Sequence, residues 1–68
     1  MKSVSGKKFC KILEANDRIL KRINGNHYIY KKEGIDYLIV VPVHKNDELK
    51  EGLLKQLLRL AELKESDI

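Results

Sequence analysis

The 68 residues are enough for one small domain, which we place over residues 1–68, and a chain this short buries a smaller fraction of its surface than an average domain does. A single cysteine excludes an internal disulfide. No apolar run approaches the roughly 18 residues of a membrane span, so the cytoplasm is the expected compartment. The net charge of +4 is concentrated in residues 1–34, where nine Lys/Arg face three Asp/Glu, and this basic front suits nucleic acid, an acidic protein partner or simple solubilisation.

A first helix is predicted from about Gly6 to Asn16. Ser5 is a suitable N-cap, because its hydroxyl can accept a hydrogen bond from an unpaired backbone N–H of the first turn. The apolar residues at helical spacing are Phe9, Ile12 and Leu13. Cys10 lies near the edge of this stripe, where a small buried thiol is expected rather than a reactive one.

Three strand-length runs follow, separated by turn signals. They cover residues 18–23, 26–32 and 37–43. Asn24 and Gly25 form the dipeptide that favours a type I′ hairpin turn, and Glu33 and Gly34 mark the next turn. The third run, YLIVVPV, is rich in β-branched residues. Its Pro42 lacks an N–H, so this end of the strand is expected to lie at a sheet edge or to leave the sheet.

A second helix is predicted after the polar stretch HKNDELKEG, with a broad apolar stripe that should face the core. The stripe consists of Leu53, Leu54, Leu57, Leu58 and Ala61. We interpret Asp47, Glu48 and Glu51 as a solvated loop and helix start rather than a cation site. The order is therefore α-β-β-β-α, an α+β fold in which two helices cover one face of a three-stranded antiparallel sheet. The other face is left open to a ligand.

Histidine is the residue type that titrates near neutrality, and the chain has two of them, His27 and His44. Taken singly, His27 is better explained as a hydrogen-bonded strand residue beside a turn, and His44 as an ordinary loop residue after a strand. An antiparallel meander can bring the start of the second strand beside the end of the third, so the two are candidates for mutual approach. RNA cleavage without a metal needs a base, an acid and cations near the phosphorane. The cations that flank His27 in sequence are Lys21, Arg22, Lys31 and Lys32.

Several segments together resemble the HicA family of small toxins. These segments are SGKKFCKILEAN, GNHYIY, VVPVH and ELKEGLLKQLLRLAEL, and they cover nearly the whole chain. The most specific are the Gly-x-His at the start of the second strand and the Val-Pro-Val-His that precedes Glu-Leu-Lys and the Leu-rich helix. Asn26 stands where the family usually has serine, and Glu62 occupies a site often held by glycine.

The resemblance implies a fold similar to the double-stranded-RNA-binding domain. It also implies a metal-independent endoribonuclease that degrades mRNA, needs no cofactor and is neutralised by a HicB-type antitoxin. The family's catalytic histidine corresponds to His27. We expect RNA contacts from the basic front and from the turn before His27. These residues are Lys7, Lys8, Lys21, Arg22, Gly25, Asn26 and Lys31.

Two alternatives to a nuclease remain at this point. One is a non-catalytic RNA-binding module of the same fold, or an inactivated toxin, for which charge and shape suffice. The other is a protein-interaction domain whose positive surface docks an acidic partner. Either a homodimer or a toxin–antitoxin hetero-oligomer is compatible with so small a core.

Overall fold

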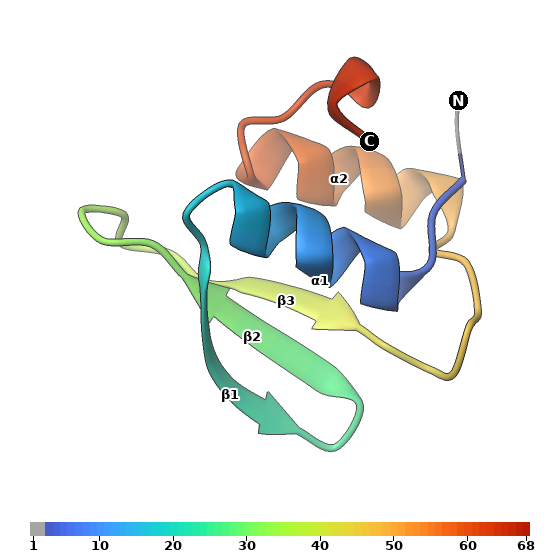
Figure 1. Cartoon of the computed structure of the whole chain (residues 1–68), viewed down its shortest axis with the longest axis horizontal. Coiled ribbons are helices and arrows are strands. Elements are labelled where there is room, and N and C mark those ends of the chain that lie inside the picture. The colour runs from blue at the N-terminus through green and yellow to red at the C-terminus, as the bar shows by residue number, and fades with distance from the viewer. Residues whose placement is uncertain (1–2) are drawn as a thin grey trace.

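The computed structural model describes residues 3–68, which form two α-helices, a three-stranded sheet and one 3-10 helix (Figure 1). The elements in chain order are α1 (Gly6–Ala15), β1 (Ile19–Asn24), β2 (His27–Lys31), β3 (Ile39–Pro42), α2 (Glu51–Leu60) and η1 (Glu65–Asp67). The predicted α-β-β-β-α order is confirmed. Residues 1 and 2 of the predicted domain lie outside the described residues.

The first helix, α1, begins where its cap places it. The Ser5 hydroxyl accepts a hydrogen bond from the backbone nitrogen of Lys8 at 3.1 Å, which confirms the predicted N-cap. The buried side chains of α1 are Phe9, Cys10 and Leu13. The first residue of the helix, Gly6, is also buried, and a side chain there would overlap the carbonyl oxygen of Pro42. The N-terminus of α1 therefore packs directly on the end of β3.

The second helix, α2, lies beside α1 (Figure 1). Its leucine stripe packs into the core. The buried residues of the stripe are Leu54, Leu57, Leu58 and Ala61. The helix ends in a Schellman motif, in which the nitrogen of Leu63 donates to the carbonyl of Leu58 at 2.8 Å and that of Glu62 to the carbonyl of Arg59 at 3.1 Å. Glu62 has a φ of 59°, the left-handed conformation for which this motif favours glycine.

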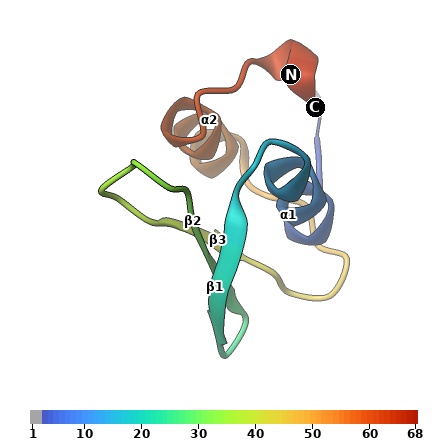
Figure 2. The same ribbon diagram turned by 60° about the vertical axis from the view of Figure 1, so that its left-hand side comes forward.

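The sheet has the order β1-β2-β3, and both strand pairs are antiparallel. The two helices lie on the same side of the sheet, as Figure 2 shows. Tyr30, Ile39 and Val41 point to that side and pack with the buried residues of both helices. The opposite face is free of any element from residues 3–68, as the sequence predicted.

The β1–β2 hairpin turns one residue later than predicted. Asn24 pairs with His27, so the two central turn residues are Gly25 and Asn26. Gly25 has a φ of 65°, while Asn26 does not have a positive φ, and this combination is that of a type II′ turn. The predicted type I′ turn centred on Asn24 and Gly25 is therefore wrong.

Contacts with the end of α2 also make the first and third strands begin later than predicted. Arg18, predicted to open the first strand, is buried instead, and its Nη2 donates to the carbonyl oxygen of Leu60 at 3.3 Å. Tyr37, predicted to open the third strand, donates its hydroxyl to the same carbonyl at 2.7 Å. The last carbonyls of a helix lack partners within the helix, which explains why two donors converge there. The predicted edge position of Pro42 is confirmed, because β3 is an edge strand.

Candidate functional site

His27 is the first residue of β2 and follows the hairpin turn directly. It lies opposite Asn24 of β1 and Pro42 of β3, and its side chain is exposed. Successive strand residues point to opposite faces, and Tyr30 faces the helices, so the His27 ring points to the face that the helices leave uncovered. Within residues 3–68 the ring makes no hydrogen bond or ion pair, so both nitrogens are available to a ligand.

The uncovered side of the sheet, here called the open face, combines His27 with cations and apolar side chains. It consists of Ile19, Arg22, Asn24, His27, Ile29, Lys31, Val40 and Pro42. None of these side chains is a carboxylate. Arg22 pairs with Ile29, two residues along β2 from His27, and Lys31 lies two residues further on. Lys21 sits at the irregularity between Leu20 and Arg22, where the register shifts. An anion on the open face would therefore meet His27 and two cations without an opposing charge.

The other predicted RNA contacts lie off this face. Gly25 and Asn26 form the turn beside His27, and the Asn26 carbonyl accepts a hydrogen bond from the nitrogen of Val43 at 2.7 Å, which ties the turn to the end of β3. Lys7 and Lys8 belong to α1, in the helical layer. The structure thus divides the predicted contacts between two sides of the sheet.

His44 is engaged elsewhere. Its Nδ1 lies 3.0 Å from Oδ2 of Asp47, and the backbone nitrogen of Asp47 donates to the His44 carbonyl at 3.0 Å. The register does bring the end of β3 beside the start of β2, since Pro42 pairs with His27. No hydrogen bond joins the two rings among the residues described, and the polar contact of the His44 ring lies within the loop before α2.

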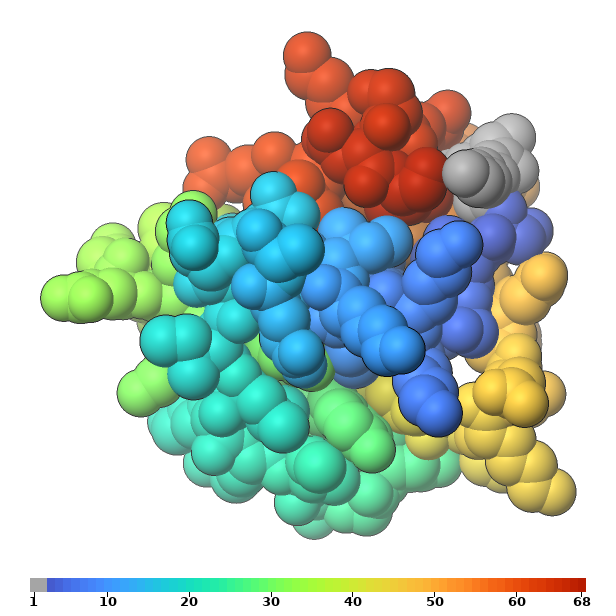
Figure 3. All heavy atoms as spheres, viewed as in Figure 1, coloured from blue at the N-terminus to red at the C-terminus, as the bar shows by residue number. Residues whose placement is uncertain are grey.

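A groove that the sequence did not predict lies between α1, β2 and the segment after β3, and we call it the α1 groove. In Figure 3, green atoms of β2 and yellow atoms of the end of β3 lie below the blue atoms of α1. The groove has a volume of about 420 Å³, and its lining includes Lys7, Lys11, Glu14, Tyr28, Tyr30 and Lys45. The alternation in HYIY places the two tyrosines on one face, but no signal in the sequence brings Lys45 to α1.

At the floor of this groove the Tyr30 hydroxyl donates a 2.6 Å hydrogen bond to Oε2 of Glu14. Burial raises the pKa of Tyr30 well above its ordinary value, and the hydrogen bond to Glu14 raises it further. Burial likewise raises the pKa of the Cys10 thiol. Neither group is a base or a nucleophile at neutral pH, so the floor is structural.

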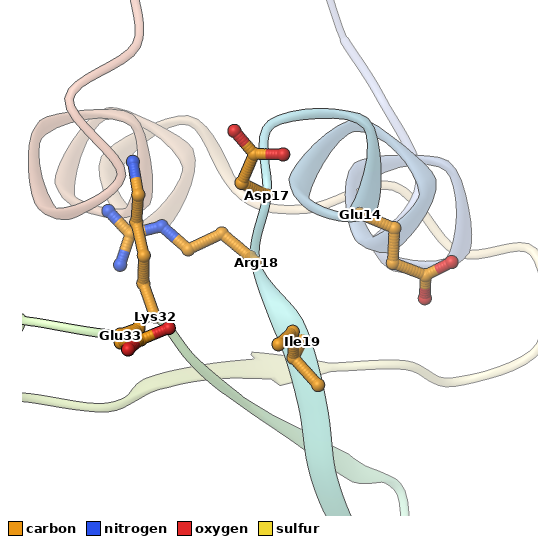
Figure 4. A pocket seen from close by; sticks show the side chains of 6 residues that line it. All are labelled: Glu14, Asp17, Arg18, Ile19, Lys32 and Glu33. Carbon is orange, nitrogen blue, oxygen red and sulfur yellow. The ribbon is translucent and has the colours of Figure 1, made fainter.

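A second hollow, at the turn from α1 into β1, has mixed charge (Figure 4). Its volume is about 440 Å³, and it is lined by Glu14, Asp17, Arg18, Ile19, Lys32 and Glu33. Arg18 is 3% exposed, and its Nη1 has no partner among the described residues. An anion is disfavoured here, because carboxylates line the hollow and the Arg18 guanidinium already faces the negative end of the α2 dipole. The Arg18 side chain therefore connects the turn between α1 and β1 to the end of α2, and it does not form a binding site.

Residues 3–68 were also searched for metal-binding groups and membrane-spanning helices. They contain no group of three or more His, Cys, Asp or Glu side chains that could hold a metal ion. No helix among them is long and apolar enough to cross a membrane.

The two helices over one face of a three-stranded antiparallel sheet define a small α+β domain of the double-stranded-RNA-binding type. The family described as the HicA toxin of bacterial toxin–antitoxin systems matches residues 6–63. The chain therefore belongs to the HicA toxin family, as the resemblance predicted, and such a toxin has an antitoxin partner. A search of curated proteins found no match.

Proposed function

We propose that this toxin is a metal-independent endoribonuclease that cleaves mRNA and uses His27 as a general acid–base. The observation that carries the proposal is the position of His27 on the open face. Its ring is exposed, has no partner within residues 3–68 and sits on a strand, so the backbone holds it while a ligand reaches both nitrogens. The turn Gly25–Asn26 leaves the strand end accessible, because glycine carries no side chain.

The chemistry needs two proton transfers and charge stabilisation. A base removes the proton from a ribose 2′-hydroxyl, the 2′-oxygen attacks the adjacent phosphorus, and the bond from phosphorus to the 5′-oxygen breaks as that oxygen takes up a proton. His27 carries one of these two transfers. Arg22 and Lys31 share its face and offset negative charge on the phosphorane, and the side chain of Lys21 adds to the positive field along β1.

A HicB-type antitoxin is the partner proposed for this toxin, in a toxin–antitoxin hetero-oligomer. Support comes from apolar side chains that lie exposed on and beside the open face. Ile19 is 56%, Val40 43% and Leu38 40% exposed. Exposed apolar groups of this kind gain little from phosphates but gain from burial against a protein. Covering these side chains would also add apolar burial, which a domain with so small a core needs for stability.

One observation favours a non-catalytic RNA-binding module as the second candidate. Catalytic histidines are usually oriented by a partner on the second ring nitrogen, and within residues 3–68 the His27 ring has none. Binding through charge alone needs no such orientation.

Cleavage of a labelled mRNA in EDTA distinguishes the two candidates. The wild type should cleave, His27→Ala should bind RNA without cleaving it, and His44→Ala should cleave like the wild type because His44 lies in the loop with Asp47. Circular dichroism confirms that the three proteins are folded. Equal cleavage by His27→Ala would contradict the assignment. If all three proteins, the wild type included, bind RNA and none cleaves it, the binding module would be established.

A further inference from the structure

We propose that the α1 groove is a second RNA site, which holds the backbone of a single RNA strand on the helical side of the sheet while His27 acts at the open face. The choice of RNA as the ligand rests on the proposed function. The groove itself is argued from its charges, its hydroxyl and its position.

The charges of the groove point to an anion. Lys7, Lys11 and Lys45 line it, and within residues 3–68 none of the three forms an ion pair or a side-chain hydrogen bond. The carboxylate in the lining is Glu14, which accepts the hydrogen bond from Tyr30. Three unpaired cations around one hollow repel one another, and this repulsion is relieved by a polyanion that lies between them.

A hydroxyl supplies a directional contact at the same place. Tyr28 is half-buried in the groove, and its hydroxyl has no hydrogen-bond partner within the described part of the chain. Tyrosine hydroxyls and lysine ammonium groups are both common donors to phosphate and sugar oxygens. The groove therefore offers point charges for phosphates and one donor that fixes their position.

The position of the groove connects it to His27. Tyr28 follows His27 in β2 and points to the opposite face, so the two side chains lie on either side of one strand end. Val43 also lines the groove, and its backbone nitrogen donates a hydrogen bond to the carbonyl of Asn26 in the hairpin turn. An RNA strand that leaves the groove at this end passes the hairpin and reaches the open face.

An acidic protein segment suits the groove less well than RNA does. None of the exposed large apolar side chains belongs to the groove lining, whereas apolar burial is the main driving force in most protein–protein association. These side chains are Ile19, Leu20, Ile23, Tyr37, Leu38 and Val40. The groove instead concentrates cations, the feature that dominates binding to nucleic acid.

The test measures binding apart from cleavage. In a His27→Ala background, fluorescence anisotropy with a labelled single-stranded RNA gives Kd over a range of salt concentrations. Replacing Lys7, Lys11 and Lys45 together by Gln should reduce the slope of log K against log salt by about 2, since each phosphate contact on a single strand contributes about 0.7, and Kd at low salt should rise at least about tenfold. Tyr28→Phe should raise Kd about 2- to 10-fold, as expected for one lost hydrogen bond.

The matched control is Lys55→Gln. It makes the same charge change on α2, where Lys55 is exposed and lies 3.9 Å from Glu51, away from the groove lining. It should leave slope and Kd near those of the background. An unchanged slope in the triple variant, or an equal change in the Lys55 control, would overturn the groove as an RNA site.

The outcomes for the groove and for the nuclease are separable. If the wild type cleaves mRNA but the triple variant binds as well as the background, the groove proposal fails and the nuclease stands. If the wild type does not cleave but RNA binding depends on the three lysines, the groove stands and the nuclease fails. A labelled oligoglutamate that binds through the three lysines when RNA does not would show an acidic protein ligand and overturn the RNA assignment.

Discussion

The hydroxyl of Tyr30 donates a 2.6 Å hydrogen bond to Oε2 of Glu14 and thereby joins the central strand β2 to α1. Tyr30 is 1% exposed, so its ring is part of the core while its hydroxyl reaches the floor of the α1 groove. One side chain therefore contributes to both packing and polar contact between the two layers of the molecule.

Tyr30→Phe keeps the ring and removes the hydrogen bond. We expect the free energy of unfolding to fall by about 1 kcal/mol, the typical net contribution of a hydrogen bond, because the exposed Glu14 carboxylate can bind water once the hydroxyl is removed. For a domain of this size that loss lowers Tm by roughly 4–8 °C. Urea or thermal unfolding of the wild type and Tyr30→Phe at pH 7 measures this difference in stability. Equal stability of the two proteins would show that the hydrogen bond makes no net contribution to the free energy of unfolding.

The same tyrosine predicts a loss of stability at alkaline pH. Burial raises the pKa of Tyr30 above its ordinary 10.0 and that of Cys10 above its ordinary 9.0. Above about pH 9 the unfolded chain therefore loses protons that the folded chain keeps, so unfolding is favoured as pH rises. Stability should be full below pH 9 and fall beyond it. Tyr30→Phe should show a shallower fall in Tm between pH 8 and 10.5, and a parallel decline in both proteins would contradict this origin.

Cys10 should resist alkylation in the folded protein. The thiolate is the reactive species, and burial both raises the thiol pKa and restricts access of a reagent. With iodoacetamide at pH 8, modification followed by mass spectrometry should be about tenfold or more slower in the native protein than in guanidinium chloride. Equal rates in the two conditions would indicate that Cys10 lies outside the core.

Two glycines should respond in opposite directions to alanine. A methyl group at Gly6 would overlap the carbonyl oxygen of Pro42, so Gly6→Ala should lower stability by about 1–3 kcal/mol as α1 moves off β3. Gly52 lies in α2 with no atom within 4 Å of an added side chain, so Gly52→Ala should raise stability by about 0.5–1 kcal/mol. Chemical unfolding of the pair, measured against the wild type, checks both signs. A neutral Gly6→Ala would disprove the close contact.

Glu62 predicts a stabilising substitution. It occupies the left-handed position of the Schellman motif after α2, with a φ of 59°. Glu62→Gly should raise the free energy of unfolding by about 1 kcal/mol, because glycine adopts this conformation without the side-chain penalty. Glu62→Ala removes the same charge but retains the penalty, so it is the matched control. A gain in Tm that is equal for both variants would attribute the effect to charge.

The amino-acid sequence determined the elements of this fold wherever the cause is local. The Ser5 cap, the turn at Glu33 and Gly34, the leucine stripe of α2 and the edge position of Pro42 were all predicted and are all observed, because each depends on neighbours within one helical turn or one strand. The family was likewise predicted from short runs of neighbouring residues, of which the Gly-x-His and Val-Pro-Val-His motifs are the most specific, and the family match over residues 6–63 confirms it.

The tertiary structure decided the features that depend on residues far apart in the chain. The hairpin turn lies one residue later than predicted, and its residue Asn26 is held by a hydrogen bond from the nitrogen of Val43, after β3. Arg18 left its predicted strand because the last carbonyls of α2 lie near it. Lys45 joins Lys11 in the α1 groove only because the end of β3 packs under α1. Charge and spacing in a sequence show which side chains are available, but packing of the core determines which of them share a surface.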